Sequence, residues 1–438
     1  MFDKLSPIKV LYLIRHKSFQ NFIFLFLIQS SNVLISLISM PLLIHALGVD
    51  QFGLVNLALS VIFLANVWVN FGYNLSGPRE IAINQGNQAV LSEVVSKVFI
   101  GKTLLAFIAC LLIVIFLLGF DFFKEYKLIL LFSLSLLFSE ATASSWFFQG
   151  LEKMKMVSMA NVFSKLLYLL ALVLFIRGPE DSPWVNLFLG LTALSINLLL
   201  LLYIHLELKI KIFLPRWKEL FLSWKENLSL FLSGIASHIS VHGGLIVLSF
   251  FATPSVLGMY SMAEKISMVL RMIPTLIIQA VYPNASKLYQ RDLMLFYGFM
   301  KKVFWIALGV SFSITILVLI FAPQIIWLIS KNNFEDSITF LRILSFVPFF
   351  ASLNFANMIL ILVADHKMLL FNSTWTFCVF MIASSSILTY LYGGVGLAYG
   401  MLATELFIFI SCSILLKLKN PIQFDGLYQR LLGRHYST

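Results

Sequence analysis

The chain has 438 residues, of which 60% are hydrophobic and only 12% are charged, and its mean hydropathy is +0.93. A soluble domain carries about twice that share of charged residues, so the composition excludes an ordinary soluble enzyme, a nucleic-acid-binding domain and a disordered chain. The formal net charge of +11 fits a polytopic membrane protein whose lysines and arginines gather in cytoplasmic loops.

The N-terminal segment argues against a cleaved signal peptide, and the cysteines argue against a metal site. The apolar stretch from about 19 to 47 is too long for a signal core, so we expect a retained first span. The cysteines, Cys110, Cys378 and Cys412, all lie inside apolar runs, and no pair has metal-site spacing. The sequence therefore predicts neither a metal nor another cofactor.

Apolar segments long enough to cross a membrane, which takes about 20 helical residues, recur along the whole chain. In order they cover 19–46, 53–74, 95–119, 128–148, 156–176, 184–205, 227–251, 257–281, 303–322, 340–363, 369–391 and 396–416. The sequence therefore predicts an all-α polytopic membrane protein with twelve transmembrane helices. An even number of crossings puts both termini on the same side.

The distribution of lysine and arginine identifies that side. The two termini and the loops on their side hold 23 of these residues, whereas the opposite loops hold 5. The loops on the basic side lie near 75–102, 149–155, 206–226, 282–302 and 364–368. Because cytoplasmic loops carry an excess of Lys and Arg, we expect both termini in the cytoplasm.

One basic segment, 96–103, ends like a phosphate-binding loop. Its first glycine is replaced by Ser96 and no strand precedes it, so we interpret it as the cytoplasmic entry to the third span and expect no ATP binding.

The longest polar break, 206–226, divides the spans into two sets of six. We expect an N-terminal lobe at 1–205, a basic linker at 206–226, a C-terminal lobe at 227–416 and a cytoplasmic tail at 417–438. Transporters are often built from two such halves, and here the two six-helix lobes are expected to enclose a central cavity. When the second half is aligned with the first by a shift of 205 residues, three residues in under thirty positions are identical. That number is close to chance.

Polar side chains form stripes at helical spacing on three spans. Span 1 carries Gln29 and Asn32, span 2 carries Asn66 and Asn70, and span 7 carries His238 and His242. Intramembrane amides either bond helices together or line a wet cavity, and the adjacent stripes favour the cavity. The histidines have a spacing that zinc accepts, but no third ligand is visible, so cavity lining is favoured there too.

Charged residues inside the spans are costly and usually have a partner or a function. Glu140 and Lys165 flank the 149–155 turn at similar depth, which predicts a structural ion pair. Arg271 lies near the middle of its span without an acid one turn away. An unpaired arginine there needs an anion, either a substrate phosphate or a buried acid such as Glu405.

Four short blocks resemble one known family. They are FGYNLSGPREIA at 71–82, SWFFQGLEKM at 145–154, YSMAEK at 260–265, and the pairs Tyr282-Pro283 and Ser286-Lys287. The blocks resemble O-antigen and polysaccharide flippases, the polysaccharide-transport branch of the multidrug/oligosaccharidyl-lipid/polysaccharide exporter superfamily. Pro78 departs from the small residue expected at that position, which makes the role of Arg79 less secure.

The resemblance implies a flippase in the bacterial inner membrane that moves an undecaprenyl-pyrophosphate-linked oligosaccharide from the cytoplasmic to the periplasmic leaflet by alternating access. Its partners are then this substrate, membrane lipids and polysaccharide-assembly proteins, with no nucleic acid. Substrate-binding residues are expected among the basic groups Arg79, Lys165, Lys265 and Arg271. Ion-coupling candidates are the intramembrane acids Glu140, Glu264 and Glu405.

Two alternatives remain open. A cation-coupled multidrug exporter of the same superfamily is expected to favour buried acids, and this chain favours buried Lys and Arg. A membrane polysaccharide polymerase or ligase is expected to carry a large periplasmic loop, whereas all outer loops predicted here are short.

Overall fold

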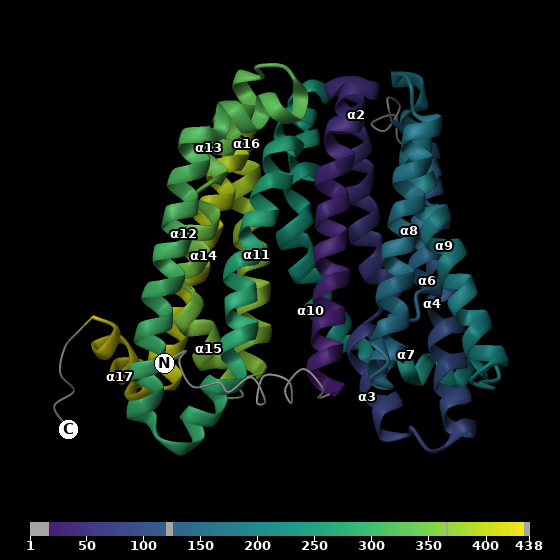
Figure 1. The fold of residues 1–438 in the computed structure, drawn as a ribbon, viewed down its shortest axis with the longest axis horizontal. Helices are drawn as coiled ribbons and strands as arrows, with labels where there is room; N and C mark the ends of the chain where they lie inside the picture. Colours follow the sequence, from purple (N-terminus) through teal and green to yellow (C-terminus); the bar gives the residue numbers. More distant parts are fainter. Residues whose placement is uncertain (1–16, 120–125, 365–366, 433–438) are drawn as a thin grey trace, which may run out of the picture. The chain divides into compact units, whose positions relative to one another are not determined.

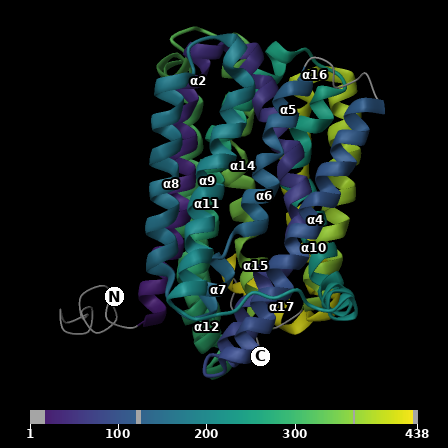
Figure 2. The same ribbon diagram turned by 90° about the vertical axis from the view of Figure 1, so that its right-hand side faces the viewer.

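The computed structural model describes residues 17–119, 126–364 and 367–432, and all regular secondary structure within these ranges is helical. The predicted all-α membrane fold is therefore confirmed. The chain forms two compact units, Met1–His238 and Ile239–Thr438. Each unit is a bundle of long helices, drawn in purple to teal for the first and in teal to yellow for the second (Figures 1 and 2).

The N-terminal unit contains nine α-helices, counting the first part of α10, among its described residues. They are α2 (Lys17–Asn70), α3 (Tyr73–Ile83), α4 (Gln88–Gly119), α5 (Lys127–Ser133), α6 (Ser135–Thr142), α7 (Ser145–Gly150), α8 (Met154–Phe175), α9 (Ser182–Leu206) and α10 (Trp217–Ser249). A short 3-10 turn, η2 (Pro179–Asp181), precedes α9.

The C-terminal unit continues from α10 through seven further helices in the described chain. They are α11 (Pro254–Arg291), α12 (Leu293–Ser330), α13 (Glu335–Leu344), α14 (Val347–Leu353), α15 (Phe355–Val363), α16 (Lys367–Lys419) and α17 (Pro421–Leu431). Asp292 alone separates α11 from α12. Its Oδ1 atom accepts hydrogen bonds from the backbone N–H groups of Met294 (2.7 Å) and Leu295 (3.3 Å), which caps the new helix.

Ten helical segments in the described chain are long and apolar enough to cross a membrane. Two of them, Leu27–Ile83 and Phe371–Lys419, have 57 and 49 residues, far more than one crossing needs. Each is broken at a glycine with positive φ, Gly48 (78°) or Gly393 (57°), a conformation that a Cβ disfavours. Counting the halves separately gives twelve crossings, and that number stays a prediction.

Two predicted spans are each divided into three short helices. The span predicted at 128–148 consists of α5, α6 and α7, and the one predicted at 340–363 falls in α13, α14 and α15. In the first, Ala143 takes an extended conformation with ψ 122° between α6 and α7. In the second, Pro348 lies in the first turn of α14 and lacks the N–H that would continue the preceding helix.

The first two resemblance blocks pack against each other in the N-terminal unit. They form α3 and α7, which lie at the same end of the unit (Figure 1). A Cβ on Gly77 would come within 2.6 Å of the Trp146 ring, and one on Gly150 within 2.6 Å of Ile81 Cβ. Close packing of α3 on α7 therefore requires glycine at both positions.

The predicted linker and the predicted tail are both partly helical. Residues 217–226 of the linker form the first turns of α10, because Glu219 Oε2 accepts a hydrogen bond from the Arg216 N–H at 3.2 Å and caps that helix. The tail contains α17, which packs on α12 and α16 (Figures 1 and 2). The lobe boundaries given above stay predictions.

Helix α17 is held by a buried polar network. The Tyr428 hydroxyl donates to Oδ1 of Asn357 over 2.8 Å, and Nδ2 of Asn357 donates to Oγ of Ser413 over 2.9 Å. Burial raises the pKa of Tyr428, so its hydroxyl keeps its proton and remains a donor at neutral pH. The network therefore fixes α17 to α15 and α16.

Candidate functional site

A cluster of one carboxylate, one amide and one ammonium lies inside the N-terminal unit. Nδ2 of Asn70 donates to Oε1 of Glu140 over 2.7 Å, and Nζ of Lys102 lies 3.5 Å from the same oxygen. The Lys102 side chain is 0% exposed and that of Glu140 is 27% exposed. Because a fully buried ammonium needs a counter-charge, Glu140 stabilises Lys102 in this position.

Helix ends and a close helix contact position these side chains. Asn70 is the last residue of α2, and Glu140 lies in the last turn of α6, before the break at Ala143. Lys102 follows Gly101 in α4, where a Cβ would come within 3.3 Å of two neighbouring side chains. These neighbours are Trp224 and Tyr73, and Lys102 reaches Glu140 because α4 also packs on α6.

This arrangement differs from the sequence prediction for Glu140. We expected Lys165 as its ion-pair partner, but Lys102 takes that place and Lys165 has no carboxylate within 4.0 Å among the described residues. Lys102 itself was assigned to the basic cytoplasmic entry of the third span. The signal that would have found it is its position inside the apolar run of α4, after Phe99 and Ile100.

A second buried ion pair lies in the C-terminal unit. The Arg271 guanidinium on α11 contacts Oε1 of Glu405 on α16 at 2.5 Å. The Glu405 side chain is 7% exposed and that of Arg271 is 31% exposed. Of the two partners considered for Arg271, the structure therefore contains the buried acid, while part of the Arg271 side chain remains exposed.

The third resemblance block lies in the same helix, two turns before Arg271. Glu264 is buried, and Lys265 lies beside it with a half-buried side chain close enough to interact with its charge. The hydroxyls of Tyr260 and Ser261 are buried and make no hydrogen bond with a described residue. Helix α11 thus carries two cations and one acid over about two turns.

The predicted cavity-lining residues fall into different environments. Gln29 and Asn32 are exposed on the first half of α2, and His238 is exposed on α10 while His242 is half-buried. Asn66 is half-buried, one turn before Asn70. Of the predicted lining residues, Asn70 is the one with a hydrogen bond to Glu140 in the described chain. Within the same part of the chain, no three His, Cys, Asp or Glu side chains are grouped to hold a metal ion.

Arg79 lies on α3 and belongs to neither ion pair. Its side chain is exposed, while Gly77 and Ile81 of the same helix face α7. The helix runs through Pro78 without interruption, so this departure from the resemblance leaves the presentation of Arg79 intact.

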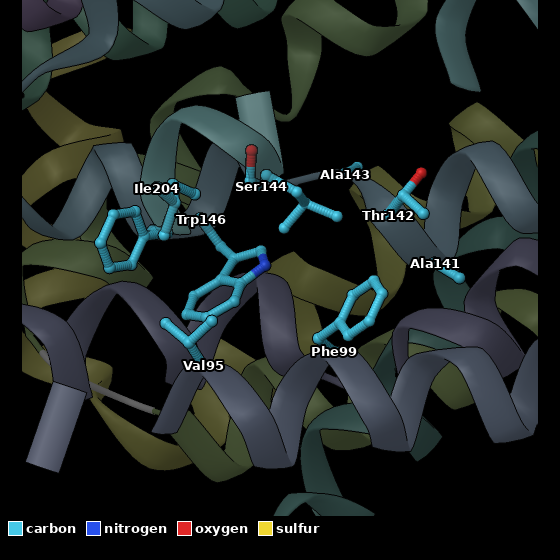
Figure 3. Close-up of a pocket in the computed structure, with 10 residues that line it drawn as sticks. Val95, Phe99, Ala141, Thr142, Ala143, Ser144, Trp146 and Ile204 are labelled. Atoms are coloured by element: carbon cyan, nitrogen blue, oxygen red, sulfur yellow. The ribbon is translucent and has the colours of Figure 1, made fainter. Parts of the chain in front are cut away.

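A small cavity lies in the N-terminal unit beside the break between α6 and α7 (Figure 3). Its lining is mainly apolar and comes from α4, α6, α7 and α9, with Phe99, Trp146 and Ile204 among the larger side chains. None of the predicted site residues lines it. The ion pairs, and not this cavity, are the candidate site.

Sequence comparison identifies related proteins. The profile of the family described as polysaccharide biosynthesis protein matches residues 18–289. A protein of Shigella dysenteriae named as an O-antigen transporter is 31% identical over 271 residues, which cover 61% of this chain and 67% of the relative. A protein of Escherichia coli strain K12 with the same name is 23% identical over 400 residues, covering 88% and 93%.

Solved structures share the fold. The lipid II flippase MurJ in an inward closed conformation has a TM-score of 0.68 at 13% identity, covering 94% of this chain and 91% of that one. An inward-facing MATE family transporter of the MOP superfamily has a TM-score of 0.64 at 15% identity, covering 91% and 99%. At such low identity these likenesses concern the fold alone.

The family profile spans more than half of the chain and includes the Glu140 cluster and Arg271. The expected family resemblance is thereby confirmed, and the chain belongs to the polysaccharide biosynthesis protein family.

Proposed function

We propose that this chain is a flippase that moves a lipid-linked oligosaccharide, such as an undecaprenyl-pyrophosphate-linked O-antigen repeat unit, from the cytoplasmic to the periplasmic leaflet. The names of its relatives and the fold it shares with MurJ support a transporter and not an enzyme. The single observation that carries the proposal is Arg271, whose partly exposed side chain is anchored by a buried carboxylate within a candidate membrane span.

Arg271 and Lys265 hold the substrate headgroup in this proposal. A pyrophosphate group carries about two negative charges, and the planar fork of arginine matches its oxygens in a way that a lysine does not. Glu405 orients the guanidinium in the absence of substrate, and the exposed 31% of the Arg271 side chain leaves room for a phosphate oxygen. Lys265 adds a compact second charge that releases the headgroup more readily.

The remaining predicted residues have supporting roles. Arg79, exposed on α3, makes the first contact with the headgroup, and Lys165 is a further cation without a carboxylate partner in the described chain. Hydroxyl-rich sugars are accommodated by the polar residues of the stripes, namely Gln29, Asn32, Asn66, Asn70, His238 and His242.

Transport is coupled to an ion gradient through the intramembrane acids and histidines. Buried carboxylates and imidazoles exchange a proton most readily when their surroundings change during the cycle. Flipping by reconstituted protein should therefore respond to an imposed proton or sodium gradient. Equal rates with and without either gradient would remove ion coupling from the proposal.

A multidrug exporter is the competing function, because MATE transporters share the fold. Cationic drugs need buried acids, yet Glu405 and Glu140 are each already neutralised by a neighbouring cation. Resistance to cationic drugs that rises on overexpression, without any change in surface polysaccharide, would favour this alternative.

The proposed setting is the bacterial inner membrane with both termini cytoplasmic and with polysaccharide-assembly proteins as further partners. Reporter fusions within 177–183 and within 206–226 should report opposite sides of the membrane. Equal sidedness would overturn the orientation drawn from the basic residues.

The proposal is tested in a deletion strain. Lipid-linked oligosaccharide should accumulate in the cytoplasmic leaflet, where it stays protected from a membrane-impermeant reagent that labels sugars, and the wild-type chain should restore access to that reagent. Accumulation in the periplasmic leaflet would instead place the block after flipping and refute the function.

A further inference from the structure

The Glu140 cluster has an unusual balance of hydrogen-bond donors and acceptors. Lys102 is fully buried, yet its ammonium makes no hydrogen bond within the described chain. The Oδ1 atoms of Asn66 and Asn70 are also buried without a partner, and these residues lie one turn apart on α2. The Glu140 carboxylate thus lies beside a single ammonium, and Asn70, which contacts it, and Asn66, one turn away, each have an unused amide oxygen.

The backbone adds further negative potential at this place. Helix α2 ends at Asn70 and α6 ends at Thr142, one turn or less from the cluster. Helix C-termini carry partial negative charge, and helix C-terminal ends and backbone carbonyls coordinate Na⁺ in transporters. The oxygens and helix ends together therefore make an environment suited to a small monovalent cation.

We propose that Lys102 is a tethered cation, whose ammonium occupies the position that a dissociable Na⁺ or K⁺ would otherwise take beside Glu140. The other groups facing Glu140 are Asn70, which donates to it at 2.7 Å, and His238, which is close enough to feel its charge. Neither replaces the ammonium, because Asn70 is neutral and His238 is exposed whereas Lys102 is fully buried.

The proposal narrows the coupling mechanism, and in this respect it rests on the proposed function. A site with a built-in cation does not exchange ions with the solvent, so Glu140 leaves the set of coupling candidates. Glu405 already has Arg271, and coupling then falls to Glu264 and the two histidines.

The test measures ion-specific stabilisation of the purified full-length protein in lipid nanodiscs. The Tm is recorded in NaCl, KCl and choline chloride at equal ionic strength. Wild type should show no difference in Tm between the salts that Glu140→Gln removes. Lys102→Met should be stabilised by NaCl or KCl relative to choline chloride, by a few degrees, because a bound ion favours the folded state. The double variant Lys102→Met with Glu140→Gln should lose that difference.

The control is a second pair on the same helix. Lys97 contacts Glu93 one turn away, with side-chain exposures of 26% and 47%, so Lys97→Met makes the same charge change at an open site. It should show no difference between the salts. The proposal is overturned if wild type is itself stabilised by NaCl in a Glu140-dependent way, or if purified Lys102→Met shows no ion-specific shift.

If Lys102→Met does not accumulate, the test uses the abundance of the variants in the membrane in place of the Tm. Adding Glu140→Gln should then restore abundance, because no unpaired buried charge remains, and a failure to restore it refutes the pairing. None of these readouts uses flipping, so a failed flippase assay and a failed cation test are distinguishable.

Discussion

The Arg271–Glu405 pair allows a structural role and a substrate role to be separated by one set of variants. Arg271→Ala leaves the Glu405 carboxylate, which is 7% exposed, without its counter-charge. Glu405→Gln instead leaves a guanidinium whose side chain is 31% exposed and can reach polar surroundings. The first variant should therefore be the more destabilised.

The magnitude follows from this asymmetry. Removing one partner of a buried pair costs about 3–5 kcal/mol, and the partial exposure of Arg271 places Arg271→Ala near the lower value. Glu405→Gln loses a hydrogen bond to a charged group, which is worth about 1.5–3 kcal/mol, and the glutamine oxygen replaces part of it. The double variant Arg271→Ala with Glu405→Gln has no unpaired charge and should recover most of the lost stability.

Three measurements on each variant decide between the roles. Protein abundance and Tm report the pair as a structural element, and surface polysaccharide reports transport. We expect the double variant to be abundant and unable to export, and Arg271→Lys to keep part of the export because the charge survives without the fork. Normal export by the double variant would refute substrate binding by Arg271.

Two further predictions concern packing. Gly150→Ala places a Cβ within 2.6 Å of Ile81 Cβ and should lower stability by about 1–3 kcal/mol, whereas Gly86→Ala, with nothing within 4 Å, should leave the Tm unchanged. Tyr428→Phe removes the donor to Asn357 and should cost about 1–3 kcal/mol in a denaturation assay. Equal Tm values for the two glycine variants, or an unchanged Tyr428→Phe, would contradict these packing assignments.

The membrane-spanning helices were predictable because an apolar run of sufficient length has few alternatives in a folded protein. The breaks inside two of these spans were not predicted, although the polar residues Thr142 and Ser144 flank Ala143 and Pro348 lies two residues after Phe346. Apolar composition reports depth in the membrane, and it does not report where backbone hydrogen bonds are interrupted.

Charged residues were found from the sequence more easily than their partners. Arg271 and Glu405 lie on α11 and α16, and their contact depends on how those helices pack, so the sequence alone favoured a phosphate over the acid. For Glu140 the hairpin spacing favoured Lys165, but the packing of α4 on α6 supplied Lys102 instead. In both cases the charged residue was visible in the sequence, whereas the helix that faces it was not.

The contact between Gly77 and the Trp146 ring also limits how the sequence of such a protein changes over time. A larger residue at 77 is excluded while a tryptophan stands at 146, because a Cβ would come within 2.6 Å of the indole. The two positions are 69 residues apart in the sequence, yet a substitution at one requires a compensating substitution at the other. Among homologous chains, a side chain gained at 77 should accompany a smaller ring or an aliphatic residue at 146.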